Sequence, residues 1–305
     1  MKSRLFTFGC SFTKYHWPTW ADILSQEYDE FQNWAQAGCG NHFILYSLIE
    51  CIRRNQLTSN DTVGVMWTGI TREDRYVDKH WKPLGSVYAE GSPYPLEYIE
   101  KFTDPAGYLI TNLALVDTCR QILDSIGCNY YFLSMVPLHS FVETKKTKFL
   151  NFLPNLEQNV LDLYAPLKKI LLPSIFELVY HNDFSSRDYV PVPHRKQQER
   201  VDALQERYNH VAGADWPTFK KFYNFDDNDN SCMKEIAKMG LVEWRDNLRR
   251  TRGDTHPTPN EHLEYLEKLN IVTITKHQRQ YAQAWTDQLL SHIPFDFSTQ
   301  LPERF

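Results

Sequence analysis

The sequence predicts an α/β fold in which a parallel sheet is covered by helices on both faces. Three observations indicate this class. Short apolar runs that fit buried strands alternate with segments of helical periodicity in the first half of the chain. The first run, Leu5–Gly9, ends abruptly before Cys10 and Ser11. Apolar residues make up 42% of the 305 residues, which is enough for a substantial core.

The elements are expected in a regular order along the chain. The predicted strands are Leu5–Gly9, Phe31–Ala35, Thr62–Trp67 and Asn129–Val136, and the predicted helices are Thr19–Tyr28, His42–Arg54, Asp117–Ile126 and Lys276–His292. Thr62–Trp67 is short and contains β-branched residues, and Pro137 ends the fourth strand. His42–Arg54 follows the turn Gly38-Cys39-Gly40-Asn41 and has apolar residues at helical spacing.

Two long stretches interrupt this alternation. Gly69–Ala106 is rich in Pro, Gly, Tyr and charge, and loops of that length are functional or disordered. His139–Arg252 contains an amphipathic helical pattern over Leu156–Tyr180, within which Ile175–Tyr180 is a candidate fifth strand. We expect one domain over residues 1–305, with 139–252 either a largely helical cap over the sheet or an extension of the core.

Composition excludes several classes of protein. The net charge is −5, so the basic footprint of a nucleic-acid binder is absent. The six cysteines form no Cys-x-x-Cys pair and indicate reduced thiols. We find no metal-binding motif and no nucleotide-binding loop, and we expect no cofactor. Without a recognisable signal peptide or membrane span, a cytoplasmic protein without a membrane partner is expected.

Two short motifs at opposite ends of the chain carry the candidate chemistry. Ser11 follows the first strand, and ligands bind at the carboxyl ends of strands in α/β sheets. The second motif is Gly253-Asp254-Thr255-His256-Pro257. A serine hydroxyl is a poor nucleophile until an imidazole accepts its proton, so His256 is the candidate base. Thr258, Pro259 and Glu261 predict a helix start just after this histidine.

These motifs resemble the SGNH (GDSL-type) hydrolase superfamily. The resemblance lies in four blocks, Phe8–Thr13, Asn33–Asn41, Val63–Arg72 and Asp254–His262. It implies a flavodoxin-like three-layer α/β/α sandwich, with Ser11 as nucleophile, His256 as general base and Asp254 as the group that orients the imidazole.

The resemblance also implies an oxyanion hole built from backbone N–H groups and an asparagine. The serine N–H and Gly38 are the backbone donors it implies, with Gly40 as the second choice for the glycine. The chain departs from the pattern at three places. Cys10 replaces an aspartate, Asp254 and His256 are one residue closer than usual, and the third block lacks the asparagine. Thr68 or Arg72 would then substitute for that asparagine, or the hole is incomplete.

Each candidate also has a structural interpretation. Ser11 fits a turn or helix cap, and His256 fits a surface residue before a helix. Arg72 fits a solvated charge beside Glu73, and Asn41 fits either a turn or the site.

The residues and the resemblance together predict a serine esterase that forms an acyl-enzyme on a small or carbohydrate-linked O-acetyl ester. Two alternatives remain open, an O-acyltransferase and a binding or assembly module on a hydrolase fold that has lost activity.

Overall fold

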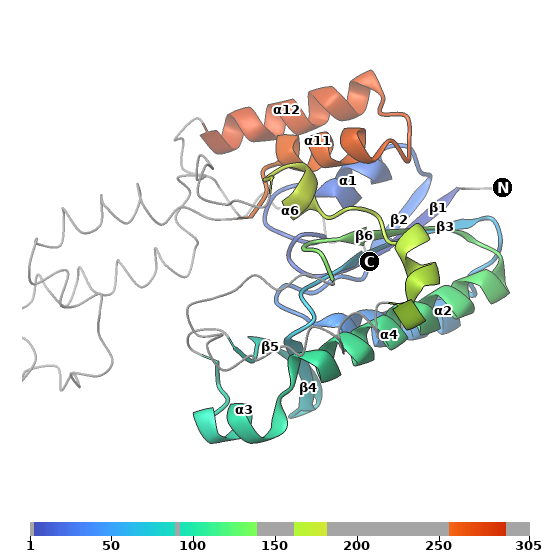
Figure 1. Ribbon diagram of the computed structural model, residues 1–305. Helices are drawn as coiled ribbons and strands as arrows, with labels where there is room; N and C mark the ends of the chain where they lie inside the picture. The colour runs from blue at the N-terminus through green and yellow to red at the C-terminus, as the bar shows by residue number, and fades with distance from the viewer. Residues whose placement is uncertain (1–2, 89–91, 139–161, 182–255, 291–305) are drawn as a thin grey trace, which may run out of the picture. The chain divides into compact units, whose positions relative to one another are not determined.

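A four-stranded parallel sheet forms the centre of the computed structural model, which describes residues 3–88, 92–138, 162–181 and 256–290 (Figure 1). The strands are β1 (Arg4–Phe8), β2 (Glu30–Asn33), β3 (Asp61–Trp67) and β6 (Asn129–Ser134), in the order β2-β1-β3-β6. Every pairing between them is parallel. All seven residues of β3 are buried, as the short apolar run predicts for a central strand. The predicted α/β class is therefore confirmed.

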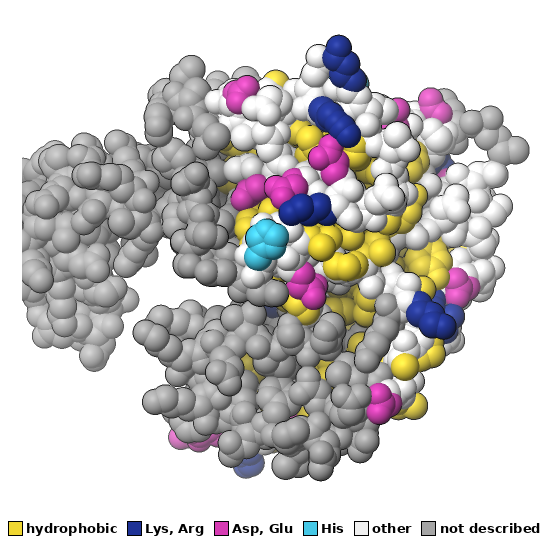
Figure 2. Space-filling model, turned by 45° about the horizontal axis from the view of Figure 1, so that its top comes forward, with side chains coloured by type: hydrophobic (Ala, Val, Ile, Leu, Met, Phe, Trp, Pro, Cys, Tyr) yellow, Lys and Arg dark blue, Asp and Glu magenta, His cyan; other side chains and the backbone are white. Residues whose placement is uncertain are grey.

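Helices cover both faces of the sheet and make the three layers visible in Figure 1. One layer holds α1 (Trp20–Ser25), α6 (Ile175–Leu178), α11 (Pro259–Leu269) and α12 (Lys276–Leu290), and the other holds α2 (Asn41–Asn55) and α4 (Pro105–Ile126). The described residues up to Thr286 belong to one compact unit. On the face drawn in Figure 2, Lys and Arg side chains are interspersed with Asp and Glu among the described residues. None of the helices in the described part of the chain has the length and apolar content that crossing a bilayer requires.

The described part of the long stretch after β3 forms regular secondary structure, so the alternative of a disordered loop is wrong there. It holds the antiparallel hairpin β4 (Arg72–Val77) and β5 (His80–Ser86), followed by α3 (Leu96–Phe102) and the first two residues of α4. Asp78 and Lys79 connect the strands with φ angles of 54° and 67°. Two left-handed residues make a turn whose twist suits a hairpin, although glycine or asparagine normally fills it.

The region after β6 also differs from its prediction. In place of one helix up to Tyr180, the described residues contain a 3₁₀ helix, η2 (Ala165–Lys169), and the short α6. Between them, Leu171 forms a single parallel bridge with Phe132 of β6. The candidate strand Ile175–Tyr180 is therefore wrong, and Leu171 occupies the place of a fifth strand. Most of the predicted insertion over 139–252 lies outside the described residues.

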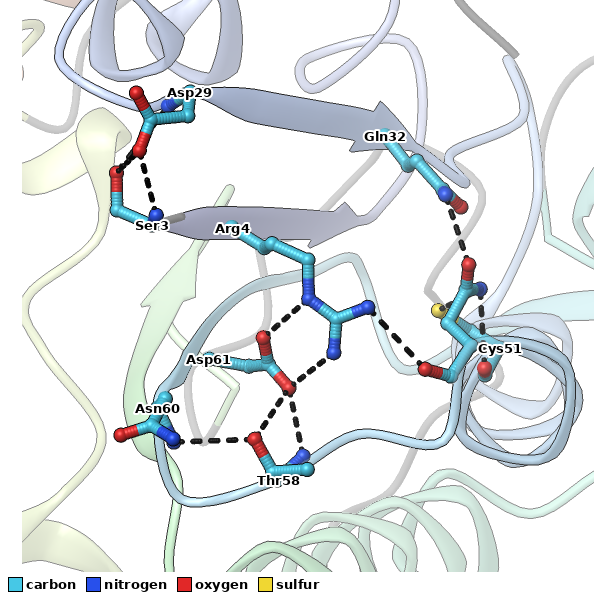
Figure 3. A network of polar contacts seen from close by, with 9 residues as sticks. Ser3, Arg4, Asp29, Gln32, Cys51, Thr58, Asn60 and Asp61 are labelled. Carbon is cyan, nitrogen blue, oxygen red and sulfur yellow. Dashed lines mark hydrogen bonds and ion pairs between the residues drawn. The ribbon is translucent and has the colours of Figure 1, made fainter. Parts of the chain in front are cut away.

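A partly buried ion pair holds the amino ends of β1 and β3 together (Figure 3). The Arg4 guanidinium donates to both carboxylate oxygens of Asp61, at 2.7 Å each, and the Thr58 N–H also donates to Asp61 at 2.7 Å. Burial alone would raise the pKa of the Asp61 carboxyl, but these hydrogen bonds and the Arg4 charge outweigh it and leave the pKa below its ordinary value. The pair fixes the register of two strands at the edge opposite Ser11.

Replacing Asp61 with asparagine is expected to lower the free energy of unfolding by about 2 kcal/mol, because the charge-assisted hydrogen bonds with the partly exposed Arg4 are lost. Since folding lowers the pKa of Asp61, its contribution is fully present above the ordinary aspartate pKa of about 4 and is lost as the pH falls further. Urea unfolding at neutral and acidic pH measures both effects. Asp78→Asn, which breaks an exposed pair with Lys82, is the control and should cost under about 1 kcal/mol.

Candidate active site

A tight turn after β1 presents Ser11 at the carboxyl edge of the sheet. The N–H groups of Thr13 and Lys14 both donate to the Cys10 carbonyl, at 2.9 and 3.1 Å. Gly9 permits this turn, because a Cβ there would lie 2.1 Å from Thr13 Oγ1. The Thr13 carbonyl accepts further hydrogen bonds from the side chains of Thr19 and Asn33. Ser11 therefore lies on a turn that is fixed by hydrogen bonds, and 7% of its surface is exposed.

The structure brings His256 to Ser11, 245 residues away in the sequence. His256 Nε2 and Ser11 Oγ are 2.8 Å apart, within hydrogen-bond distance. The neighbouring helix α11 begins at Pro259, where Thr258 and Glu261 form the predicted capping box. A serine hydroxyl in contact with an imidazole nitrogen is the arrangement that general-base activation requires. Asp254, the expected third member, lies outside the described residues.

Aromatic side chains that the sequence analysis did not include surround His256. The Tyr15 ring stacks on the imidazole, with centroids 3.8 Å apart and planes inclined by 18°. The Phe12 ring lies at 5.5 Å and is tilted by 55°. Trp17, which is 1% exposed, donates from Nε1 to the Pro257 carbonyl at 2.7 Å. These contacts fix the backbone beside His256 as well as its ring.

The loop that contains Gly38 is tied to the residues just before Ser11. The Gln36 N–H and the Cys39 thiol both donate to the Gly9 carbonyl, at 3.1 and 3.2 Å. Gly38 has a φ of 79°, a left-handed conformation that favours glycine. Burial raises the pKa of the Cys39 thiol, so this cysteine is an uncharged packing residue.

The structure corrects the expectation for Gly40. Its N–H donates to Asp74 Oδ1 at 2.7 Å, and the Phe43 N–H donates to the other oxygen at 3.0 Å. Asp74, on β4, therefore caps the amino end of α2, whose own N-cap residue Gly40 has no side chain. Burial raises the Asp74 pKa, and the hydrogen bonds from Gly40 and Phe43 partly offset this effect. Because its N–H is already engaged, Gly40 is not an oxyanion donor here.

Asn41 and Thr68 face each other in the interior. The Thr68 N–H donates to Asn41 Oδ1 at 2.9 Å, and Asn41 Nδ2 donates to Asn112 Oδ1 at 2.7 Å. Asn112 also donates to the Ile70 carbonyl, so one buried network fixes the loop after β3. Thr68 is fully buried and Asn41 is 2% exposed. Both residues support the loop, and Asn41 makes no Asx turn.

Arg72 lies beside the Gly38 loop. Its Nη1 donates to the Cys39 carbonyl at 3.3 Å, and its Nη2 lies 3.9 Å from Met135 Sδ. The same sulfur is 3.7 Å from Cys10 Sγ, next to Ser11 in the chain. Within the described residues Arg72 forms no ion pair with a carboxylate. The described residues also contain no cluster of metal-ligating side chains.

Comparisons with known proteins find only distant similarity to solved structures. No family model and no curated protein matches the chain. Among solved structures, the chain is similar to a provisionally named acylhydrolase from Bacteroides fragilis (11% identity, TM-score 0.30, 56% of this chain and 67% of that one). It is also similar to a member of the lipolytic G-D-S-L family from Veillonella parvula, with 14% identity and a TM-score of 0.32 over 61% of this chain and 85% of that one. A third similar structure is that of a Bacillus subtilis protein, with 12% identity and a TM-score of 0.32 over 60% of this chain and 46% of that one.

Proposed function

We propose that the protein is a serine esterase that acts through an acyl-enzyme on a small or carbohydrate-linked O-acetyl ester. The observation that carries the proposal is the 2.8 Å contact between Ser11 Oγ and His256 Nε2. In the proposed reaction, His256 takes the hydroxyl proton as Ser11 attacks the ester carbonyl, and returns it to the leaving alcohol. The same imidazole then activates the water that releases the acid, and Asp254 orients the ring.

The negative charge that develops on the ester carbonyl oxygen in the transition state must be stabilised by hydrogen-bond donors. We assign the N–H groups of Ser11 and Gly38 to this role, since the Gly40 N–H is held by Asp74. Arg72 takes the place of the missing asparagine, because its guanidinium lies against the Gly38 loop without an ion pair among the described residues. One oxyanion donor is typically worth about 3 kcal/mol of transition-state stabilisation.

Purified protein is expected to hydrolyse p-nitrophenyl acetate and to release acetate from an acetylated oligosaccharide. Both rates should be measured with and without a free sugar acceptor, because an acyltransferase would form acetylated acceptor with negligible acetate release. Folded protein that neither hydrolyses nor transfers the acetyl group of either substrate would contradict the proposal. That result would favour a binding or assembly module.

A further inference from the structure

We propose that Tyr15 is a positioning residue for His256, whose ring stabilises the imidazolium ion formed when Ser11 gives up its proton. The inference rests on the proposed function, since the imidazolium has a catalytic role only in that reaction. Tyr15 lies four residues after Ser11, in the segment that joins β1 to α1.

The geometry places the face of one ring over the face of the other. The Tyr15 and His256 centroids are 3.8 Å apart, closer than the other stacked pairs among the described residues, Tyr94 with Tyr98 at 4.8 Å and Tyr46 with Trp81 at 5.4 Å. The Nε2 edge of the imidazole meanwhile faces Ser11 Oγ. The stack therefore fixes the plane of the imidazole and leaves its reacting edge directed at the nucleophile.

One buried tryptophan holds both partners of the stack. The Trp17 ring meets the Tyr15 ring edge to face, at 4.6 Å and 82°. Trp17 Nε1 also donates to the carbonyl of Pro257, the residue after His256. Because Trp17 is 1% exposed, the segment that carries Tyr15 and the backbone at His256 are fixed relative to each other. The contacts of Trp17 therefore hold the Tyr15 and His256 rings together.

The face of an aromatic ring attracts a cation more strongly than it attracts an uncharged ring. The His256 imidazole becomes a cation only as it takes the proton from Ser11, so the contact is stronger in the transition state than in the ground state. Replacing the ring with an aliphatic side chain is expected to reduce kcat by about tenfold, with little change in KM.

Other ionisable groups lie on the elements that pack around His256. His16 is on the segment that carries Tyr15, Asp22 is on α1, and Glu261 and His262 are on α11. The Asp22 and Glu261 carboxylates each accept hydrogen bonds within a helix capping box. None of these groups changes in a Tyr15 variant, so a shift in titration would report the loss of the ring.

The test compares Tyr15→Leu with Tyr15→Phe in two measurements. Proton NMR follows the titration of the His256 imidazole, assigned by the resonance that disappears in His256→Gln, and steady-state kinetics gives the pH profile of kcat/KM. Without the aromatic face the protonated imidazole is less stable, so in Tyr15→Leu both midpoints should move to lower pH by about half to one unit. Tyr15→Phe, which keeps the ring, should match the wild type in midpoint and kcat.

A midpoint that stays at the wild-type pH in Tyr15→Leu would overturn the proposal, as would Tyr15→Phe behaving like Tyr15→Leu. If Tyr15→Leu fails to fold, Tyr15→Met, which keeps bulk without an aromatic face, replaces it. The NMR titration requires no turnover. A midpoint that moves in protein without esterase activity therefore supports the stack and rejects the proposed function, whereas an unmoved midpoint in active protein rejects the stack alone.

Discussion

Replacing Ser11 with alanine is expected to reduce ester hydrolysis by on the order of 10⁴-fold or more, the size of effect seen when a serine nucleophile is removed from a catalytic triad. The physical reason is that, in the proposed reaction, the acyl-enzyme forms on Ser11 Oγ, the hydroxyl in contact with His256 Nε2. The neighbouring thiol of Cys10 is fully buried and contacts Met135 Sδ, so it is not expected to replace the serine as nucleophile. Initial rates with p-nitrophenyl acetate measure the loss.

The matched control for this variant is Ser59→Ala. Ser59 is exposed in the turn before β3, at the edge of the sheet opposite Ser11. It should retain wild-type turnover, and thermal melting should show that both variants fold. Wild-type-like hydrolysis by Ser11→Ala would refute the assignment of the nucleophile, even if the overall esterase activity were real.

Replacing His256 with alanine is expected to cause a loss of similar size, because the Ser11 hydroxyl then has no base to accept its proton. Residues that act as one unit do not contribute additively, so the double variant Ser11→Ala with His256→Ala should be no slower than Ser11→Ala alone. Turnover of the three variants measures this directly. His277→Ala, an exposed histidine on α12, is the control and should remain fully active. A further large loss in the double variant would contradict a shared role.

The elements that the sequence predicts well are those with a local signal. The capping box of Thr258 and Glu261 and the following Pro259 place the start of α11 at the residue where the structure has it. The buried run before Trp67 gives β3, because a central parallel strand is apolar on both faces. Asp104 and Pro105 form a similar start signal for α4, which begins twelve residues before the predicted Asp117.

The hairpin could not be predicted because its turn lacks the usual residues. Asp78 and Lys79 both adopt positive φ without glycine or asparagine, and Pro83 lies within β5. The single helix expected up to Tyr180 overlooks Pro166 and Pro173, which disfavour a continuous helix. Over Leu156–Tyr180 the apolar periodicity fits a helix, but the two prolines prevent one.

The residues around the candidate site that the sequence analysis missed act across long separations. Asp74 caps a helix that begins 33 residues earlier, and Asn112 supports a loop 42 residues away through Ile70. No spacing rule connects such partners. Tyr15 is four residues from Ser11, but its stacking on His256 depends on the convergence of the two ends of the chain. Only the fold brings these groups together.

Covalent labelling measures directly whether Ser11 is an activated nucleophile. Wild-type protein is incubated with a fluorophosphonate, and the adduct is located by intact-mass measurement and peptide mapping. We expect one adduct, on Ser11, that is absent in Ser11→Ala and strongly reduced in His256→Ala. An unmodified mass for folded wild-type protein, or an adduct on another residue, would contradict this expectation.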